Sequence, residues 1–290
     1  MNTPDPDPIA GLAELAPLYR HLLCDVWGVV HDGVSAFPAA GEALARFRAG
    51  GGNVVLITNA PRPRQAVLKQ LDRLGVDRAA YDDVLTSGEV SRGFLAARPG
   101  VKVLYVGPER DLALFDGLDV IVTETAAEAN LIACTGLFND ETETPEDYDE
   151  RLAAWNALEL PMLCVNPDRV VERGPKLVWC AGAIADRYAE IGGETVIIGK
   201  PHAPIYATAL RRLADLAHAP VEKGAVLAIG DGIETDVRGA FQAEIDVLFV
   251  AGGIHAELFG DRSAPAAEAV GSFLADCGLG ARAFIPRLVW

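Results

Sequence analysis

The sequence feature that most constrains the fold is a set of short apolar runs, each ending in a polar residue. The four polar residues are Asp25, Thr58, Lys200 and Asp231. Each run has the length and composition of a buried strand, and helical patterns separate the runs. This alternation predicts an α/β fold with parallel sheets. The carboxyl ends of parallel strands share one edge of a sheet, so we expect these four side chains to form one site.

The expected elements follow from local patterns of apolar, capping and turn residues. Strands are expected at 22–24, 53–58, 101–105, 118–122, 130–135, 161–165, 195–198, 225–229 and 246–250. Helices are expected at 38–50, 63–74, 176–191, 203–217 and 234–243, with a short amphipathic segment at 8–19. A further helix begins after Thr144, which suits an N-cap because Pro145 and two acidic residues follow it. Trp155 and Trp179 fall on apolar helix faces and are expected in the core.

Composition excludes several classes of function. The chain has 290 residues, half of them hydrophobic, and 25 Lys and Arg against 41 Asp and Glu give a net charge of -16. This charge argues against a nucleic-acid or anionic-membrane surface. No apolar run approaches the ~18 residues of a membrane span. The first ten residues lack the pattern of a signal peptide, so a cytoplasmic location is expected.

The cysteines are five in number and scattered, without the spacing of a zinc or redox pair. They are Cys24, Cys134, Cys164, Cys180 and Cys277. Each lies among apolar neighbours, so we expect buried free thiols in a reducing compartment.

The residue types at the strand ends indicate a chemistry. Asp25 and Asp231, with Asp236 one helical turn further on, are oxygen ligands of the kind that Mg²⁺ prefers. Lys200 and the hydroxyl of Thr58 suit an anion. A metal, a lysine and a hydroxyl around an aspartate are typical of phosphoryl transfer, in which one aspartate can attack phosphorus itself.

Four segments together resemble the motifs of the haloacid dehalogenase-like hydrolase superfamily, in their order along the chain. The segments are Asp25-Val26-Trp27-Gly28-Val29, Ile57-Thr58-Asn59, Gly199-Lys200-Pro201 and Gly230-Asp231-Gly232-Ile233-Glu234-Thr235-Asp236. The long insertion between the second and third motifs, with Asn166-Pro167-Asp168, resembles the α/β cap of the class IIA members.

This resemblance implies a two-domain organisation. Residues 1–78 and 195–290 would form a doubly wound Rossmannoid core, and residues 79–194 a smaller α/β cap domain. Class IIA members include phosphatases of pyridoxal phosphate, phosphoglycolate, nucleotides and sugar phosphates. They often dimerise through the cap, so the resemblance also implies a homodimer.

The resemblance assigns roles around a metal ion. Asp25 would be the nucleophile and a metal ligand, and Asp231 a second ligand. Asp236 would support the water shell of the metal, and Trp27 would lend its backbone carbonyl. Lys200 would bridge the nucleophile and the phosphate.

The resemblance also assigns residues to the substrate. Thr58 and Asn59 would hold the phosphate. Arg62 follows the second motif as an arginine does in many class IIA members, so a substrate or cap contact is one interpretation and a solvated loop cation the other. Asn166 and Asp168 correspond to a cap signature, although Asn-Pro-Asp is also an ordinary turn.

Trp27 is the departure from the pattern, because phosphatases of this superfamily have an aspartate there as general acid and base. An indole N–H cannot transfer a proton near neutral pH. Trp27 is therefore interpreted as a stacking surface, as a packing residue in an enzyme with an activated substrate, or as the mark of a site that binds without turnover. His31 and Asp32 either supply the missing proton transfer or only shape the turn.

The sequence favours a Mg²⁺-dependent phosphohydrolase of a small phosphorylated metabolite, acting through an aspartyl-phosphate on Asp25. One alternative is a phosphometabolite-binding or regulatory protein with weakened turnover. Another is an atypical hydrolase of carbon–phosphorus or carbon–halogen bonds, with Lys102 or Lys176 as the Schiff-base lysine that phosphonate chemistry needs. Nothing in the sequence selects the substrate.

Overall fold

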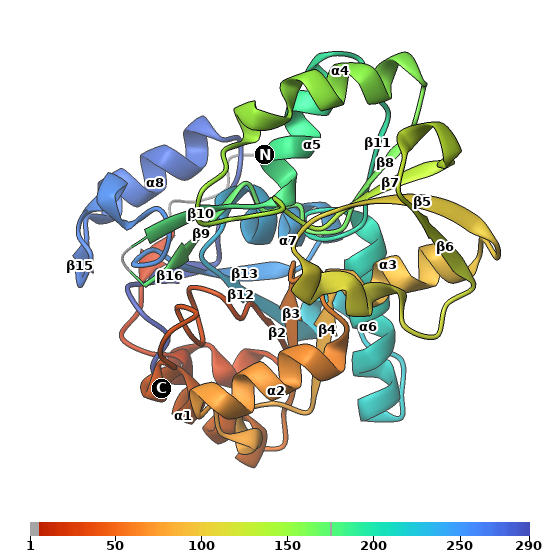
Figure 1. Ribbon diagram of the computed structural model, residues 1–290. Coiled ribbons are helices and arrows are strands. Elements are labelled where there is room, and N and C mark those ends of the chain that lie inside the picture. Colours follow the sequence, from red (N-terminus) through yellow and green to blue (C-terminus); the bar gives the residue numbers. More distant parts are fainter. Residues whose placement is uncertain (1–5, 175) are drawn as a thin grey trace. The chain divides into compact units, whose positions relative to one another are not determined.

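A computed structural model describes residues 6–174 and 176–290 and divides the chain into two compact units. The first unit comprises the chain up to residue 58 together with 68–85 and 200–290, and the second comprises 59–67 and 86–199. Each unit is built around one main sheet with helices packed on it (Figure 1). The α/β fold with parallel sheets that the sequence predicts is therefore confirmed.

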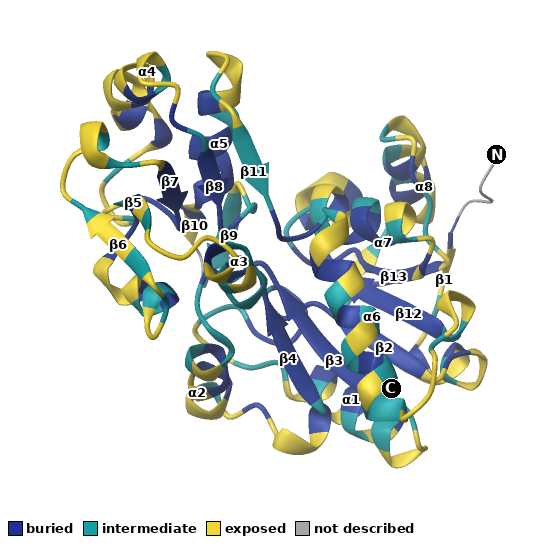
Figure 2. Ribbon diagram, turned by 90° about the vertical axis from the view of Figure 1, so that its right-hand side faces the viewer, coloured by how far each residue is buried: buried dark blue, intermediate teal, exposed yellow. Residues whose placement is uncertain are grey.

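The sheet of the first unit has seven strands in the order β1-β16-β13-β12-β2-β3-β4. Their bounds are β1 (Asp7–Pro8), β2 (His21–Cys24), β3 (Asn53–Thr58), β4 (Asp83–Thr86), β12 (Val226–Gly230), β13 (Asp246–Val250) and β16 (Ala283–Ile285). In this order each strand from β1 through β16, β13, β12 and β2 to β3 pairs in parallel with the next. The central strands β2, β3 and β12 are buried along almost their whole length (Figure 2), as strands covered on both faces are.

Helices connect these strands. They are α1 (Pro38–Ala49), α2 (Arg64–Leu74), α6 (Ala203–Ala217), α7 (Arg238–Ala243) and α8 (Ala267–Asp276), and a short pair β14 (Gly260–Asp261) and β15 (Ala264–Pro265) precedes α8. Helix α1 begins with a proline in its first turn and buries Ala40, Ala43, Leu44 and Phe47 along one face. Helix α6 ends at His218, whose φ of 51° is left-handed and closes the last turn.

The second unit has a parallel sheet in the order β11-β8-β7-β5-β6. Its strands are β5 (Val101–Val106), β6 (Val120–Thr123), β7 (Leu131–Cys134), β8 (Met162–Cys164) and β11 (Thr195–Ile197). Its helices are α3 (Ser87–Ala96), α4 (Asp149–Ala157) and α5 (Ala181–Glu190), and β9 (Val170–Arg173) pairs with β10 (Lys176–Trp179) in a hairpin. One hydrophobic cluster includes Leu152, Trp155 and Ile184, and another includes Leu95 and Leu114, so both faces of the sheet are covered.

The chain before α4 shows how a predicted cap forms. The backbone N–H of Thr144 donates to the Asp147 carboxylate at 2.8 Å, in a reciprocal capping box. The first turn, Pro145–Tyr148, is a 3-10 turn, and the α-helix begins at Asp149. Trp155 is 8% exposed, so its predicted place in the core is confirmed.

Four local predictions are wrong. Residues 176–179 form the strand β10 and not the first turn of a helix, because this apolar segment pairs with β9 and the helix begins only at Ala181. Trp179 lies on that hairpin and is 41% exposed, so it is not a core residue. Residues 8–19 form two 3-10 turns instead of a helix. Cys277 is only partly buried, whereas the other four cysteines are buried free thiols as expected.

The limits predicted for the inserted domain also differ from the sheets. Residues 83–86, which lie within the predicted cap of 79–194, form strand β4 at the edge of the first sheet. Strand β11, predicted in the core, pairs with β8 in the second sheet through Thr195, Val196 and Ile197. Local pattern cannot assign a strand to a sheet, because pairing is a long-range property.

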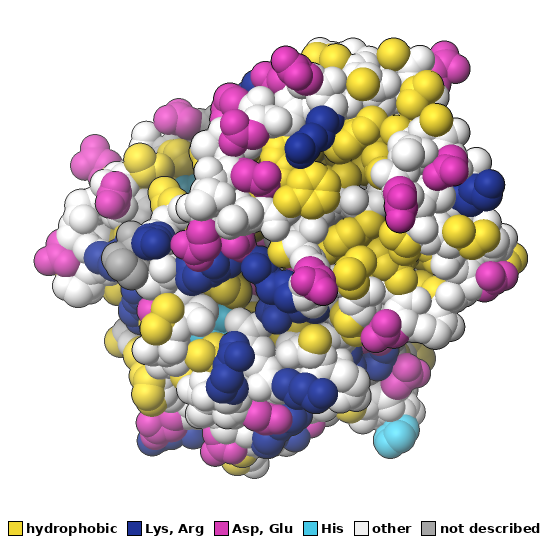
Figure 3. Space-filling model, viewed as in Figure 1, with side chains coloured by type: hydrophobic (Ala, Val, Ile, Leu, Met, Phe, Trp, Pro, Cys, Tyr) yellow, Lys and Arg dark blue, Asp and Glu magenta, His cyan; other side chains and the backbone are white. Residues whose placement is uncertain are grey.

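The net charge of -16 is not spread evenly. Basic side chains over α1 and α2 lie among acidic ones (Figure 3). Two ion pairs are examples: Arg46 contacts Glu42 at 2.5 Å within α1, and Arg78 contacts Asp72 of α2 at 2.7 Å. Such exposed pairs form a solvated surface of mixed charge and contribute little to stability.

Among the helices of the described residues, 6–174 and 176–290, none is long and apolar enough to span a membrane.

Candidate active site

Asp25 and Asp231 are placed side by side by the register of the first sheet. Cys24 at the end of β2 is opposite Ile229 in β12, and the backbone N–H of Asp25 donates to the carbonyl of Ile229 at 2.8 Å. Asp231 follows directly after β12. As whole residues, Asp25 is 5% and Asp231 6% exposed. The predicted meeting of strand ends is therefore correct for this pair.

Asp236 approaches the pair from the segment after β12. Residues Ile233–Val237 form a single turn of π-helix before α7, where an α-helix was predicted to begin at Glu234. Such turns are rare and often occur at functional sites. The Asp236 carboxylate accepts the backbone N–H of Gly232 at 3.1 Å and is 4% exposed. The π-turn thus directs this side chain back toward the end of the strand.

Lys200 joins two of these carboxylates. Its Nζ lies 2.5 Å from Oδ1 of Asp25 and 2.7 Å from Oδ1 of Asp236, and the side chain is almost fully buried. Lys200 was predicted to lie at the edge of the first sheet, but β11, the strand before it, belongs to the second sheet. Lys200 comes instead from the loop before α6. Its predicted neighbourhood is correct, but a shared sheet edge is not the reason.

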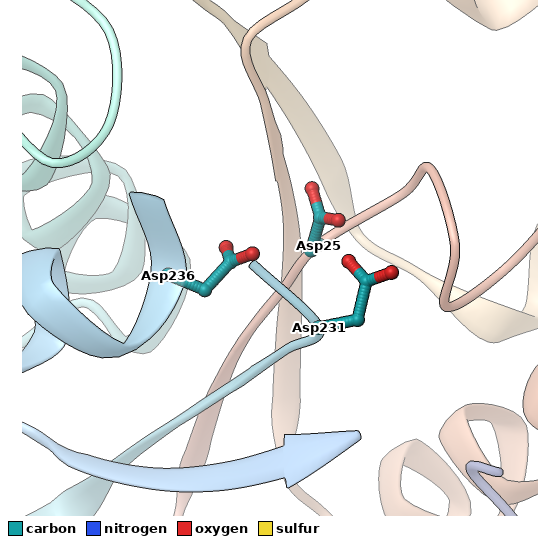
Figure 4. Close-up of side chains that lie close together, drawn as sticks. All are labelled: Asp25, Asp231 and Asp236. Carbon is teal, nitrogen blue, oxygen red and sulfur yellow. The ribbon is translucent and has the colours of Figure 1, made fainter. Parts of the chain in front are cut away.

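The three carboxylates converge, as Figure 4 shows. One oxygen each from Asp25, Asp231 and Asp236 lies within 4.8 Å of the others, and all three residues are buried. Burying several like charges is costly unless cations compensate them. The ammonium of Lys200 contacts two of the three carboxylates, those of Asp25 and Asp236. The donor set of oxygens and the excess negative charge fit a divalent cation.

Burial and the nearby Asp236 carboxylate raise the pKa of Asp25 well above its usual value, with a further contribution from Asp231. The Lys200 ammonium opposes this shift by favouring the charged carboxylate. A further cation at the cluster would act in the same direction as Lys200. The electrostatics of the site therefore favour a bound cation whenever Asp25 is ionised.

Glycines make room for the carboxylates. A Cβ at Gly253 would lie 2.1 Å from Oδ2 of Asp231, and one at Gly230 would lie 2.2 Å from Cγ of Asp236. The backbone N–H of Ile254 donates to Oδ2 of Asp231 at 2.9 Å. The turn after β13 thus fixes Asp231. This turn was not predicted, although the pair Gly252-Gly253 just after a predicted strand was a signal for it.

Thr58 ends β3, which pairs with β2, and its side chain is 5% exposed. Asn59, the next residue, belongs to the second unit, where its amide donates to Oδ1 of Asp168 at 2.8 Å. The backbone N–H of Asp168 in turn donates to the side-chain oxygen of Asn166 at 3.2 Å. Three of the predicted substrate residues, Asn59, Asn166 and Asp168, are therefore brought together.

Arg62 has a partner that the sequence did not predict. Its Nε lies 3.8 Å from Oδ1 of Asp111, within the second unit. Asp111 is 3% exposed, and burial raises the pKa of its carboxyl against the lowering effect of Arg62. No local signal marks this aspartate, since it lies in a 3-10 segment that looks like any polar turn.

The loop after Asp25 holds Trp27, His31 and Asp32 together. Trp27 is half-buried, and its ring meets the edge of the His31 ring with centroids 5.1 Å apart. Oδ1 of Asp32 accepts the backbone N–H groups of Val34 at 2.9 Å and Ser35 at 2.7 Å. Burial would raise the pKa of Asp32, but these donors outweigh it and lower that pKa. Asp32 thus serves the turn.

Comparison with known proteins agrees with this geometry. Residues 22–121 match the haloacid dehalogenase-like hydrolase family, and residues 197–277 match a second HAD-like hydrolase family. A crystal structure of a haloacid dehalogenase-like hydrolase from Brucella suis 1330 is 46% identical, covers 96% of this chain and 99% of its own, and superposes with a TM-score of 0.87. This chain belongs to the haloacid dehalogenase-like hydrolase family. Its α/β second unit is that of a class IIA member, as the sequence predicted.

More distant relatives of this hydrolase carry assigned activities. The ribonucleotide monophosphatase NagD of Escherichia coli K12 is 26% identical over 239 residues, which cover 81% of this chain and 88% of NagD. The D-glycerol 3-phosphate phosphatase of Mycobacterium tuberculosis is 26% identical over 262 residues, which cover 84% of this chain and 66% of that protein. The family shows that the chain is a hydrolase, and phosphatases are among its relatives.

Proposed function

We propose that this protein is a Mg²⁺-dependent phosphohydrolase of a small phosphorylated metabolite, with Asp25 as nucleophile. The observation that carries the proposal is the contact of Lys200 Nζ with Asp25 and Asp236 beside a third buried carboxylate, that of Asp231. The phosphatase activities of NagD and of the glycerol-phosphate enzyme support the same chemistry. A binding site for a neutral ligand would not need this concentration of charge.

Asp25, Asp231 and the backbone carbonyl of Trp27 would hold the Mg²⁺ ion, and Asp236 would support its water shell. When bound, the ion supplies positive charge to the oxygens of the phosphoryl group. Lys200 keeps Asp25 oriented through the 2.5 Å contact and adds a second positive charge. The hydroxyl of Thr58, at the end of β3, is suited to donate to a phosphoryl oxygen, and we assign Asn59, next in the chain, to the same group.

The reaction has two displacements at phosphorus. A carboxylate oxygen of Asp25 attacks phosphorus while the ester bond breaks, and the leaving group departs with the bonding electrons. Water then attacks phosphorus, breaks its bond to Asp25 and releases phosphate. The carboxylate is regenerated, so each turnover consumes one ester and one water.

Arg62, Asn166 and Asp168 are assigned to substrate recognition. The Asp168 carboxylate accepts the side-chain amide of Asn59 at 2.8 Å, and we assign Asp168 the role of orienting Asn59. Arg62 offers a guanidinium held by the buried Asp111 carboxylate. A rigid guanidinium of this kind suits a carboxylate or a second phosphate on the metabolite.

Release of inorganic phosphate from a panel of phosphate esters, with Mg²⁺ and after its removal by a chelator, tests the proposal. We expect release that requires Mg²⁺ and is lost in Asp25→Asn. Asp32→Asn is the matched control, because an asparagine oxygen can still accept the N–H groups of Val34 and Ser35. Release that persists in Asp25→Asn would show that another group attacks phosphorus.

A second candidate is a protein that binds a phosphometabolite without turning it over, and Trp27 favours it. Tight binding of a phosphate ester in the panel with no phosphate release, in wild type and Asp25→Asn alike, would support this candidate and exclude the enzyme.

A further inference from the structure

The orientation of Trp27 is fixed by its own loop. A Cβ at Gly33 would lie 2.5 Å from Cζ2 and 2.7 Å from Cη2 of the indole, so the ring lies directly over this glycine. Gly33 also has a φ of 84°, which favours glycine. The His31 ring supports the indole at an interplanar angle of 74°, and the backbone N–H of Gly28 donates to the carbonyl of His31 at 2.8 Å. These contacts fix the orientation of the Trp27 indole, an apolar ring two residues from Asp25 in the sequence.

Two other polar side chains of this loop, His31 and Asp32, accept hydrogen bonds from backbone N–H groups. Nδ1 of His31 accepts the backbone N–H of Gly33 at 3.0 Å, and the residue is 1% exposed. The Asp32 carboxylate accepts two backbone N–H groups, as described above. Both residues therefore hold the loop that positions the indole. Two residues after Asp25 the loop thus carries an indole, which cannot transfer a proton near neutral pH.

The ionisable groups that act electrostatically on Asp25 are Asp236, Lys200 and Asp231. Lys200 bonds both Asp25 and Asp236. Asp236 also accepts the N–H of Gly232, and Asp231 accepts that of Ile254. These groups balance charge around the nucleophile and bind cations. Their contacts assign them to the phosphoryl side of the reaction and not to the leaving group.

The leaving group must therefore depart without a proton from these residues. We infer that the enzyme prefers phosphoryl donors whose leaving group is a stable anion, namely acyl phosphates, phosphoanhydrides and aryl phosphates, over alkyl phosphate esters. The conjugate acids have a pKa of about 4 for a carboxylate, about 6 for a phosphate and about 10 for a phenolate. An alkoxide resembles hydroxide, whose conjugate acid, water, is a far weaker acid than any of these three, so an alkoxide is a much poorer leaving group. This inference rests on the proposed function and narrows its substrate class.

The step is balanced without an acid. An oxygen of Asp25 forms a bond to phosphorus, the bond from phosphorus to the leaving oxygen breaks, and that oxygen keeps the electron pair. Solvent protonates the released anion where its basicity requires it. The planar indole also gives an aryl group a surface for stacking.

A graded series of donors tests the inference on the intact wild-type protein with Mg²⁺. The series is acetyl phosphate, pyrophosphate, 4-nitrophenyl phosphate, phenyl phosphate and glycerol phosphate, and kcat/KM is measured for each. We expect kcat/KM to fall steeply from the acidic to the alkyl leaving groups. General acid catalysis is worth about 10²- to 10⁴-fold, so glycerol phosphate should lag the acyl and aryl donors by at least that factor.

Two variants at one position separate proton transfer from packing. In Trp27→Asp we expect glycerol phosphate to gain at least about 10-fold relative to acetyl phosphate, because an acid becomes available. Trp27→Phe keeps an apolar ring without an acid and should keep the steep series. Circular dichroism of each variant checks that it folds.

The outcomes distinguish this inference from the proposed function. Asp25-dependent turnover with similar kcat/KM for glycerol phosphate and acetyl phosphate overturns the inference alone, because another group then supplies the proton. Turnover of no donor, or turnover that Asp25→Asn retains, overturns the proposed function. The wild-type series gives this answer even where a variant fails to fold.

Discussion

At the scale of single residues, Lys200 has the greatest effect on the site. It is the ammonium group that contacts both Asp25 and Asp236, and its own side chain is 3% exposed. A buried charge is tolerated only with partners, so each of these three side chains depends on the other two. The sequence identified Asp25 and Lys200 because each follows an apolar run, and Asp236 because it lies one helical turn after Asp231. It could not identify Tyr206, whose hydroxyl contacts the carbonyl of Asp236 at 3.4 Å from within an ordinary helix.

Replacement of Lys200 by methionine removes the cation and leaves two carboxylates facing each other. We expect Lys200→Met to lower the free energy of unfolding by about 3 kcal/mol without metal, the cost of breaking a buried pair. Urea denaturation measures it. Lys223→Met is the matched control, because Lys223 pairs with Glu244 at the surface, where a pair contributes about 0–1 kcal/mol. Equal losses in the two variants would contradict the role of Lys200.

Gly253 leaves room for the Asp231 side chain in the carboxylate cluster. In Gly253→Ala the new Cβ would lie only 2.1 Å from Oδ2 of Asp231, so this carboxylate must move. We expect Mg²⁺ affinity, measured by calorimetry, to fall by about 10- to 100-fold, as when the support of a metal ligand is lost. Gly41→Ala in α1 is the control, since no atom lies within 4 Å of its new Cβ. That change should keep the affinity and add about 0.5–1 kcal/mol of stability.

At the scale of elements, prediction succeeds where local chemistry decides the structure. Strand β3 and helix α6 have the predicted bounds, because a β-branched run and a proline-initiated amphipathic helix each specify one conformation. Residues 176–179 were assigned to a helix because their partner, β9, lies at an unpredicted place in the sequence. Strand β16 and helix α8 were not predicted at all, since their apolar patterns are short and weakly bounded.

The hairpin of β9 and β10 gives a prediction for pH. Arg173 at the end of β9 contacts the carboxylate of Asp140 at 2.8 Å, and Arg110 contacts the same carboxylate. Burial would raise the pKa of Asp140, but the hydrogen bonds from Arg173 and Arg110 lower it overall. The carboxylate therefore stabilises the fold above the usual aspartate pKa of about 4, and this contribution is lost as the pH falls through the lower folded value.

We expect Asp140→Asn to cost about 1.5–3 kcal/mol at pH 7, the typical value for hydrogen bonds to a charged group. The cost should shrink as the pH falls below about 4, because the unfolded state then binds a proton at Asp140, and it should vanish once the pH is below the lower pKa of the folded carboxyl. Urea denaturation across this pH range measures the difference. Glu109→Gln, at an exposed carboxylate in the 3-10 segment of Arg110, is the control and should cost less than about 0.5 kcal/mol. A cost for Asp140→Asn that stays constant with pH would refute this assignment.

At the scale of the whole molecule, the residues expected at one site fall into two groups. Asp25, Lys200, Asp231 and Asp236 converge in the first unit, and Asn59, Asn166 and Asp168 in the second. The sequence predicted that Asp25 and Asp231 meet, because strand ends share one edge of a parallel sheet. Lys200 and Asp236 reach the same group from the loop before α6 and from the π-turn. The sequence could not define which strand belongs to which unit, as β4 and β11 show.

Metal binding should be visible in the stability of the whole chain. A ligand that binds only the folded state adds about 2.7 kcal/mol when its concentration is 100 times its Kd. We expect Mg²⁺ to raise the Tm of the wild type and to leave that of Asp231→Asn nearly unchanged. A differential scan with and without Mg²⁺ compares them, and an equal rise in both would place the ion elsewhere.

The central claim is that Asp25 itself accepts the phosphoryl group. The most direct test is the mass of the intact protein after brief mixing with acetyl phosphate and Mg²⁺ and quenching in acid, followed by peptide mapping. We predict an added mass of one phosphoryl group on the peptide that contains Asp25, and none in Asp25→Asn. Phosphate release without any adduct on that peptide, or an adduct that Asp25→Asn retains, would contradict the claim.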